Sequence, residues 1–233
     1  MKKNTETKPE SFFSSKAVIV EGREDRNFIL NFLRKLKIDD QIYVHEIGGN
    51  NLRDESKKSL KLAASSSNFK QKVRHLAIIF DGDGNKSKTL QRVSAELSEI
   101  NLKFEQLEFF LCDKVNEVNH NLDLKNKKLF EIKTFLFLFE KNLEDAFLKT
   151  LPETDLDIVK NCIPSFFKCA NAKEKDKRVV QAFLSIKKSK YDLARDIGVA
   201  SGQGLVDFEH AYFENLKKFL LDFANLNLNQ SKT

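Results

Sequence analysis

Apolar and polar positions alternate along the chain in the order of a strand, a turn and a helix. Short runs rich in Val, Ile, Leu and Phe are followed by polar, glycine-containing turns and then by apolar side chains at helical spacing. Such runs predict buried strands, and the segments after them predict amphipathic helices. The predicted strands are 17–20, 42–47, 75–80 and 104–112, and the predicted helices are 24–36, one that ends near 66, and 87–100.

Repeated units of this kind imply an α/β fold with a mostly parallel sheet, right-handed crossovers and helices on both faces. The rest of the chain is predicted to contain a short strand at 135–139 and a helix at 142–151, and then to be helical in three segments, 155–167, 176–197 and 208–223. The glycine-rich stretch 198–204 is predicted to be a flexible linker.

The last helical segment is predicted to pack back on the sheet, because one of its sides carries most of the large apolar residues. That side consists of Phe208, Ala211, Tyr212, Asn215, Phe219 and Phe223. We therefore expect a flexible tail at 1–15, an α/β domain at 16–151 and a helical C-terminal extension at 152–233 that packs on the same domain.

Composition narrows the class of protein. The chain has 233 residues, of which 41% are hydrophobic and 32% charged, and no apolar run approaches the roughly 18 residues of a membrane span. We therefore expect a cytoplasmic protein without a membrane partner. The three cysteines lack paired spacing, so neither a disulfide framework nor a zinc site is predicted, and their thiols are expected to be buried or idle. The net charge of +6 is compatible with a polyanionic partner.

Three acidic residues stand directly after predicted strands. Glu21 follows the first strand, and Asp81 and Asp83 follow the third. The carboxyl ends of parallel strands share one edge of the sheet, where ligands bind, and neighbouring strands lie about 5 Å apart. If the first and third strands are neighbours, these carboxylates converge and repel one another. Mg²⁺ or Mn²⁺ would relieve the repulsion, because both prefer oxygen ligands such as carboxylates and phosphates.

The sequence DGDG at 81–84 allows other interpretations. It can be a tight turn whose Asp side chains cap the next helix. An EF-hand loop fails, because its sixth and twelfth positions hold Lys86 and Arg92 where Gly and Glu are needed. A haloacid-dehalogenase-type phosphatase also has a strand that ends in D-x-D-G. That motif normally follows the first strand and continues with Thr or Val, where this chain has Asn85.

The motifs VIVEGREDRNF at 18–28 and AIIFDGDGN at 77–85 resemble the Toprim domain of topoisomerases, bacterial primases, OLD nucleases and recombination mediators. More narrowly, GGNNL at 48–52, NLEDAFL at 142–148 and KDKRVVQAFLSI at 175–186 resemble small standalone Toprim-like proteins of unassigned activity. These proteins are related to the Toprim half of OLD nucleases, and the resemblance extends from about 16 to 223.

The resemblance implies a Mg²⁺-dependent phosphodiester site with a defined set of residues. Glu21 would act as general acid/base or metal ligand, and Asp81 and Asp83 would bind metal. Asp25 and Glu144 match two further OLD-type acids that could complete a two-metal site, although Asp25 and its neighbour Glu24 also suit the first turn of a helix. One departure is Lys141-Asn142, where relatives often have Gly or an acid.

A lysine and three glycines are further candidates. Lys177 matches a position where relatives tend to have Lys, and a cation there could stabilise charge on a transferred phosphate, although its basic neighbours also suit a solvated face. Gly22, Gly48 and Gly49 are candidate contacts to a bound phosphate, because glycine lets backbone and ligand approach closely.

A metal-dependent nuclease that acts on DNA or RNA, with a partner ATPase as a further candidate, is therefore the leading hypothesis. The alternative is a non-catalytic Toprim module that binds nucleic acid or protein. The tyrosines lie in strand or helix patterns and no zinc ribbon or ATPase motif accompanies them, which disfavours topoisomerase and full primase activity.

Overall fold

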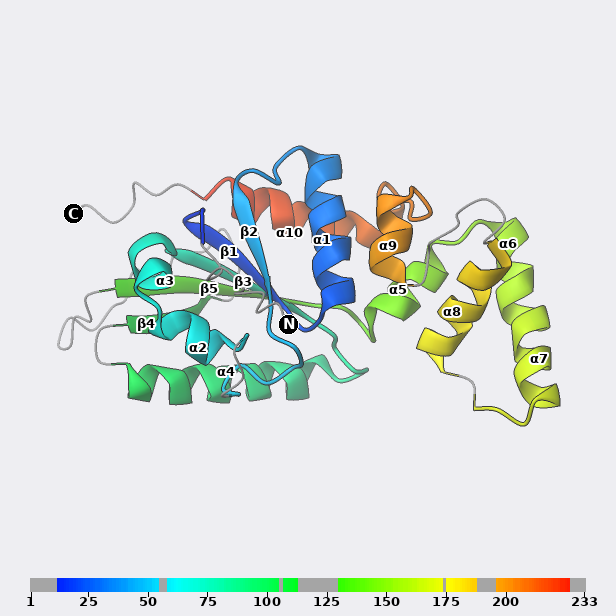
Figure 1. Ribbon diagram of the computed structural model, residues 1–233, viewed down its shortest axis with the longest axis horizontal. Helices are drawn as coiled ribbons and strands as arrows, with labels where there is room; N and C mark the ends of the chain where they lie inside the picture. Colours follow the sequence, from blue (N-terminus) through cyan, green and yellow to red (C-terminus); the bar gives the residue numbers. More distant parts are fainter. Residues whose placement is uncertain are drawn as a thin grey trace, which may run out of the picture.

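The computed structural model describes residues 12–54, 58–104, 107–112, 130–173, 175–187 and 196–226. Within these ranges a five-stranded sheet has the order β2-β1-β3-β5-β4 (Figure 1). Every neighbouring pair of strands is parallel, so the predicted parallel sheet flanked by helices is confirmed. The strands are β1 (Lys16–Val20), β2 (Ile42–Glu46), β3 (His75–Phe80), β4 (Leu107–Cys112) and β5 (Phe130–Leu138).

The winding of the sheet changes direction between β1 and β3. From β1 the chain passes through α1 (Arg23–Leu36) to β2 at one edge, whereas from β3 it passes through α4 (Lys86–Lys103) to β4 at the opposite edge. Connections that leave neighbouring strands in opposite directions open a crevice at the carboxyl ends of those strands, where ligands bind in open α/β sheets. The first and third strands are thus neighbours, as the metal-site prediction required.

Helices cover both faces of the sheet (Figure 1). One face packs against α1 and α10 (Glu214–Ala224), with α9 (Ile197–Gly202) packed on α1, and the other face packs against α2 (Leu60–Ser65), α3 (Ser67–Lys72) and α4. Side chains of β1 alternate between the two resulting cores, because successive strand residues point to opposite faces. Val18 and Val20 join the first core, and Ala17 and Ile19 join the second.

A group of helices lies at the end of the molecule where β3 and β5 end (Figure 1). It consists of α5 (Leu143–Lys149), α6 (Glu153–Asp157), the π-helix η1 (Ile158–Cys162), α7 (Ile163–Cys169) and α8 (Asp176–Ile186). Phe147 of α5 contacts Phe183 of α8 with ring centroids 6.1 Å apart. Buried residues of α5, α7 and α8 belong to the same apolar core as those of α1.

The stretch 198–204 is not the predicted flexible linker, because most of it forms α9. Asp196 caps this helix by accepting a hydrogen bond from Val199 N at 2.8 Å. The glycine at 198 permits close packing on α1, since a Cβ there would lie 2.6 Å from the carbonyl oxygen of Glu24. The small residues that resemble a linker in sequence are therefore a helix contact in the fold.

Two further helix predictions need correction. The helix predicted to end near 66 is two helices, because Ser59 and Ser66 each cap a new one by accepting from a backbone N–H at 3.2 Å. The last helical segment comprises the 3₁₀ helix η3 (Ala211–Phe213) and α10, and its predicted inner face is partly wrong, because Ala211 and Asn215 are exposed. The buried side chains are Phe208, Phe213, Leu216, Leu220 and Phe223.

Parts of four predictions lie outside the described residues: the tail before 12, positions 105–106 of the strand at 104–112, positions 188–195 of the helical segment at 176–197, and the C-terminal extension beyond 226. Phe12 of the predicted tail is buried against Tyr43 and Phe69. In the described ranges no helix is long and apolar enough to cross a membrane. Of the three cysteines, expected to be buried or idle, Cys112 is partly buried and Cys162 and Cys169 are exposed.

Candidate active site

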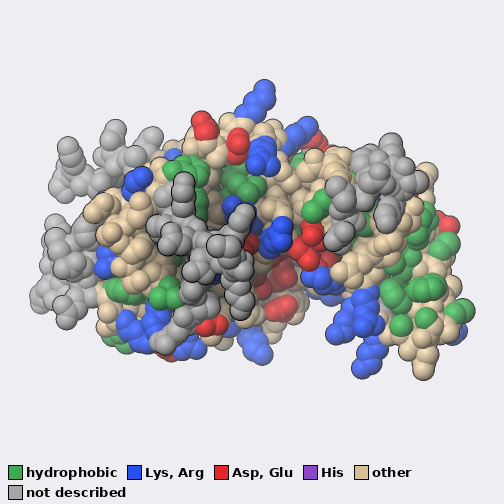
Figure 2. Space-filling model, in the orientation of Figure 1, with side chains coloured by type: hydrophobic (Ala, Val, Ile, Leu, Met, Phe, Trp, Pro, Cys, Tyr) green, Lys and Arg blue, Asp and Glu red, His purple; other side chains and the backbone are tan. Residues whose placement is uncertain are grey.

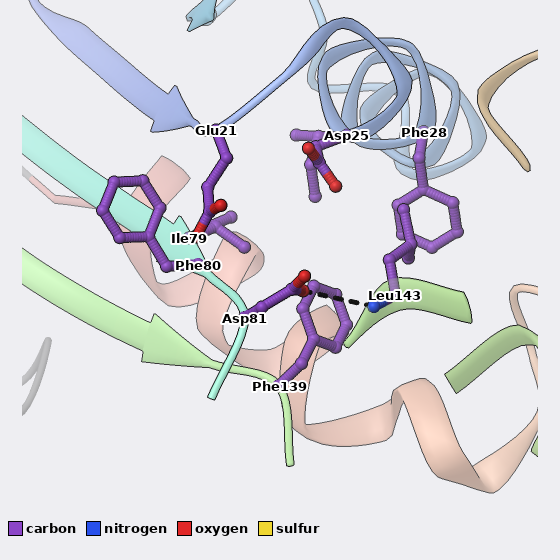
Figure 3. A pocket seen from close by; sticks show the side chains of 9 residues that line it. Glu21, Asp25, Phe28, Ile79, Phe80, Asp81, Phe139 and Leu143 are labelled. Carbon is purple, nitrogen blue, oxygen red and sulfur yellow. Dashed lines mark hydrogen bonds between the residues drawn. The ribbon is translucent and has the colours of Figure 1, made fainter. Parts of the chain in front are cut away.

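Two acids stand at neighbouring strand ends. Glu21 follows the last residue of β1 and Asp81 follows the last residue of β3, and these strands are hydrogen-bonded neighbours with Val20 paired to Ile79. Figure 3 shows both side chains turned toward one pocket, together with that of Asp25 from α1. The rest of the pocket wall is apolar and comprises Phe28, Ile29, Ile79, Phe80, Phe139 and Leu143.

Asp25 is held by the start of its own helix. Its Oδ2 accepts a hydrogen bond from the backbone N–H of Gly22 at 2.9 Å, which is half of the reciprocal capping seen at helix N-termini. Gly22 has an ordinary extended backbone conformation. Its N–H is therefore bound to Asp25, and the predicted contact of this glycine with a phosphate has no support from the hydrogen bonding.

Asp81 is anchored across the site. Its Oδ1 accepts a hydrogen bond from the backbone N–H of Leu143, the first residue of α5, at 3.2 Å. The next residue, Gly82, is pressed against the end of β5, because a Cβ there would lie 2.2 Å from the carbonyl oxygen of Phe139. Gly84 has a φ of 71°, a conformation that glycine adopts without strain. The two glycines of the DGDG turn thus shape the backbone that presents Asp81.

Asp83 differs from Asp81 in position. It is exposed, has a φ of 48° and donates its backbone N–H to the carbonyl oxygen of Lys141 at 2.9 Å. Its charge contributes less than those of Asp25, Glu21 and Glu144 to raising the pKa of Asp81. The structure therefore groups Asp83 with the rim of the site and Asp81 with its interior.

Burial and mutual repulsion make the interior acids hard to ionise together. Burial, followed by the charges of Asp25 and Glu21, raises the pKa of Asp81 to about 8. Burial and the charge of Asp25 raise the pKa of Glu21 to about 7. Burial, opposed by the hydrogen bond from Gly22 and reinforced by Glu144, raises the pKa of Asp25 to about 6. A full set of negative charges here needs a compensating cation.

Glu144 approaches the same site from α5, and burial raises its pKa too. Asp145, its neighbour, turns away to an ion pair with Lys149 at 2.9 Å.

Lys141 and Asn142, which depart from the pattern of the Toprim-like relatives, have structural roles. Asn142 caps α5 by accepting from Asp145 N at 2.7 Å, and Lys141 lies 2.5 Å from Asp176 of α8.

Lys177 lies at the border of the site. Its Nζ is 2.8 Å from Oε1 of Glu24, in the first turn of α1, and its charge lowers the pKa of Glu144. The ion pair joins α8 to α1. Glu24, which suits the first turn of a helix, is thus also the partner of the predicted catalytic lysine.

The loop after β2 lies beside Glu21. Gly48 and Gly49 are exposed, with φ of 75° and 150°, and Gly49 donates its N–H to the carbonyl oxygen of Glu21 at 2.9 Å.

Sequence reasoning missed Arg92 of α4, whose positive charge lowers the pKa of Glu21. No local pattern marks Arg92, because its proximity to Glu21 depends on how α4 packs under the sheet.

The donor set suits a hard divalent cation, because Glu21, Asp25, Asp81 and Glu144 offer only carboxylate oxygens and repel one another without one. In the conformation seen in the described residues, no group of three or more His, Cys, Asp or Glu side chains is arranged to hold a metal ion. Asp25 and Asp81 each give one oxygen to a backbone N–H, which leaves the other available to a ligand.

Comparison with solved structures finds two similar protein regions. The C-terminal region of the Burkholderia pseudomallei OLD protein matches with a TM-score of 0.47 and 16% identity, over 91% of this chain and 100% of that chain. The C-terminal region of the Xanthomonas campestris pv. campestris OLD protein matches with a TM-score of 0.44 and 16% identity, over 91% of this chain and 97% of that chain.

Comparison with curated proteins finds no match. The family model described as "Protein of unknown function (DUF3226)" matches residues 15–225, which is most of the chain. The chain therefore belongs to this family.

Proposed function

We propose that this chain hydrolyses phosphodiester bonds in nucleic acid with the help of Mg²⁺ or Mn²⁺, on a Toprim-type domain. The observation that carries the proposal is the convergence of Glu21, Asp25 and Asp81 on one pocket. This pocket lies at the carboxyl ends of β1 and β3, where the winding of the sheet changes direction. The pKa of each is raised. Groups with strongly shifted pKa values in a cleft are typical of functional sites. The resemblance of the β1 and β3 motifs to Toprim supports the same conclusion.

Glu21, Asp25 and Asp81 would hold the metal, with Glu144 and Asp83 as further ligands toward the rim. A bound divalent cation would supply Lewis-acid stabilisation of the charge that develops on the phosphate oxygens. Glu21 is suited to move a proton near neutral pH, because its pKa is about 7. Lys177, held beside the site by Glu24, would add positive charge near the leaving or attacking oxygen.

A nucleic-acid substrate fits the distribution of charge. Acidic side chains gather near the middle of one face, with Lys and Arg side chains beside them (Figure 2). Arg92 from α4 and Lys177 from α8 bring cations to the acids from separate elements. Flanking cations attract a phosphate backbone that the carboxylates alone would repel. DNA and RNA share this backbone, and the proposal includes both as substrates. It also includes an ATPase as a protein partner.

One observation favours a second candidate, the non-catalytic binding module. Asp25 and Asp81 both have hydrogen bonds to backbone N–H groups, so part of their presence is explained by helix capping. A module of this kind would bind nucleic acid or protein without a metal. Its weakness is Glu21, whose pKa is raised by burial and by the charges of Asp25 and Asp83 even though its carboxylate accepts a hydrogen bond from the backbone N–H of Asp81.

The test is a cleavage assay with end-labelled single-stranded and duplex DNA and RNA, in Mg²⁺, Mn²⁺ or EDTA. We expect metal-dependent cleavage that falls by about 100-fold or more in Glu21→Gln and Asp81→Asn. Lys177→Ala should reduce it less. Glu131→Gln, which changes an exposed acid of β5, is the matched control and should retain full activity. Retention of nucleic acid without cleavage, unaffected by EDTA, would favour the binding module.

A further inference from the structure

A buried carboxylate of α4 holds the loop that follows β2. Glu96 is only 5% exposed, and its Oε2 accepts a hydrogen bond from the backbone N–H of Leu52 at 2.8 Å. Its other oxygen, Oε1, lies 3.6 Å from Nη1 of Arg92, one helical turn earlier. A buried charge is costly unless it is paired and hydrogen-bonded. Glu96 is therefore committed to these two partners.

Arg92 joins the same loop at a second point. Its Nη1 donates a hydrogen bond to the carbonyl oxygen of Asn50, and its guanidinium lies over the ring of Phe80, 5.6 Å from the ring centroid. Phe80 is the last residue of β3 and directly precedes Asp81. Glu96 and Arg92 thus attach the loop to the underside of the candidate site.

The opposite side of the loop is attached to β1. Gly49 donates its N–H to the carbonyl oxygen of Glu21 at 2.9 Å, and Ile47 donates to Val20 at 3.0 Å. Gly48 and Gly49 are exposed, and a Cβ at either would meet no atom within 4 Å. Side-chain packing does not hold this part of the loop. Ile47 and Leu52 on either side of it are buried in the core that α4 shares, and between them the loop is held by its hydrogen bonds to β1 and by Arg92.

We propose that Arg92 and Glu96 are positioning residues that fix the Gly48–Leu52 loop and, through Gly49, the backbone of Glu21. The peptide carbonyl of Glu21 sets the direction in which its side chain leaves the end of β1. Release of the loop from α4 would loosen this carbonyl and the carboxylate that follows it. How Arg92 and Glu96 hold the loop does not depend on the proposed nuclease function. The effect of the loop on catalysis does rest on that function.

The experiment measures amide hydrogen exchange in the full chain, without metal or substrate, for wild type, Arg92→Ala, Arg92→Lys and Glu96→Gln. Lys103→Gln, which changes an exposed cation at the far end of α4, is the control. In Arg92→Ala and Glu96→Gln we expect exchange at Gly49 and Leu52 to become faster by about tenfold to a hundredfold, the effect of losing a charge-assisted hydrogen bond. Arg92→Lys should keep part of the protection of these two amides from exchange. The control, Lys103→Gln, should keep all of it.

Unchanged exchange at Gly49 and Leu52 in Arg92→Ala would overturn the proposal. So would an equal increase across β3 and α10, which would make Arg92 and Glu96 general stabilising residues. If Glu96→Gln fails to fold, the two Arg92 variants decide the outcome. Because exchange needs no activity, an inactive wild-type protein would contradict the proposed function without affecting this test. If the wild type cleaves, the loop variants should lower kcat, with partial recovery in Arg92→Lys.

Discussion

The carboxylate of Asp81 accepts a hydrogen bond from the backbone N–H of Leu143 at 3.2 Å, across 62 positions of sequence. Leu143 begins α5, which carries Glu144 into the same site. The acid at the end of β3 thus fixes the start of the helix that brings a further carboxylate. Its capping role and its proposed metal-binding role can be separated by substitution.

Asp81→Asn should stabilise the metal-free protein at pH 8, because it removes a buried charge and keeps an acceptor for Leu143. The pKa of Asp81 is raised to about 8, so the folded protein holds a proton that the unfolded chain releases near pH 4. The free energy of unfolding that Asp81 contributes is therefore fully present at low pH, and it is lost progressively as pH rises from about 4 through 8. We expect a gain of about 1–3 kcal/mol at pH 8 and little at pH 4.

Urea unfolding in EDTA at both pH values measures this gain. Asp81→Ala is the comparison, and it should be less stable than Asp81→Asn because it also loses the acceptor for Leu143. A lower stability of Asp81→Asn than of wild type at pH 8 would show that the charge at this position is not a cost.

Gly82→Ala and Gly84→Ala should differ in severity. A Cβ at Gly82 would lie 2.2 Å from the carbonyl oxygen of Phe139, so we expect a loss of roughly 2–4 kcal/mol in the free energy of unfolding. Gly84 has a φ of 71° in open space, and only its conformational preference is lost, at about 1–2 kcal/mol. Denaturant unfolding measures both. Equal losses would contradict the close packing of Gly82 on β5.

Gly198→Ala tests whether α9 packs on α1. The new Cβ would lie 2.6 Å from the carbonyl oxygen of Glu24, and we expect a loss of roughly 2 kcal/mol or more. Gly202→Ala is the matched control, because its Cβ would meet only the side-chain end of Asn31, at 3.0 Å. Thermal unfolding should therefore show a much smaller effect for Gly202→Ala. If 198–204 were a flexible linker, neither substitution would matter.

His75 should make the protein less stable in mild acid. Burial, reinforced by Lys133, Lys16 and Arg74, lowers the pKa of His75 to about 4. Between pH 6.5 and 4 the unfolded chain binds a proton there that the folded protein does not, so stability falls as pH falls through this range. The slope is at most about 1.4 kcal/mol per pH unit. His75→Phe should lack this pH-dependent loss of stability. Free energies of unfolding, measured for both proteins from pH 7 to 4, would contradict the prediction if they fell in parallel.

The central acids could be predicted from sequence because their positions depend on local signals. Apolar runs locate β1 and β3, and Glu21 and Asp81 are the first polar residues after them. Parallel pairing then places both at one edge. Asp83 shares this signal but lies on the rim, because the turn rotates successive side chains in different directions, which spacing does not reveal.

Features that depend on contacts between distant segments were missed. Gly198 resembles a linker residue until α1 is packed against it, and Arg92 and Glu96 resemble an ordinary surface pair one helical turn apart until the loop at Leu52 lies over them. The pairing of Lys177 with Glu24 joins segments 153 positions apart. No local pattern encodes such contacts, because they follow from the packing of whole elements.

The most direct test of the central claim is calorimetric titration of the protein with Mn²⁺ at pH 7.5. The variants are Glu21→Gln and Asp81→Asn, with Glu131→Gln as the control. We predict binding to wild type and to Glu131→Gln, and an affinity at least about tenfold weaker, a difference of about 1.4 kcal/mol, in each of the other two. Absence of binding to wild type, or equal affinity in all four proteins, would contradict the assignment of these carboxylates as a metal site.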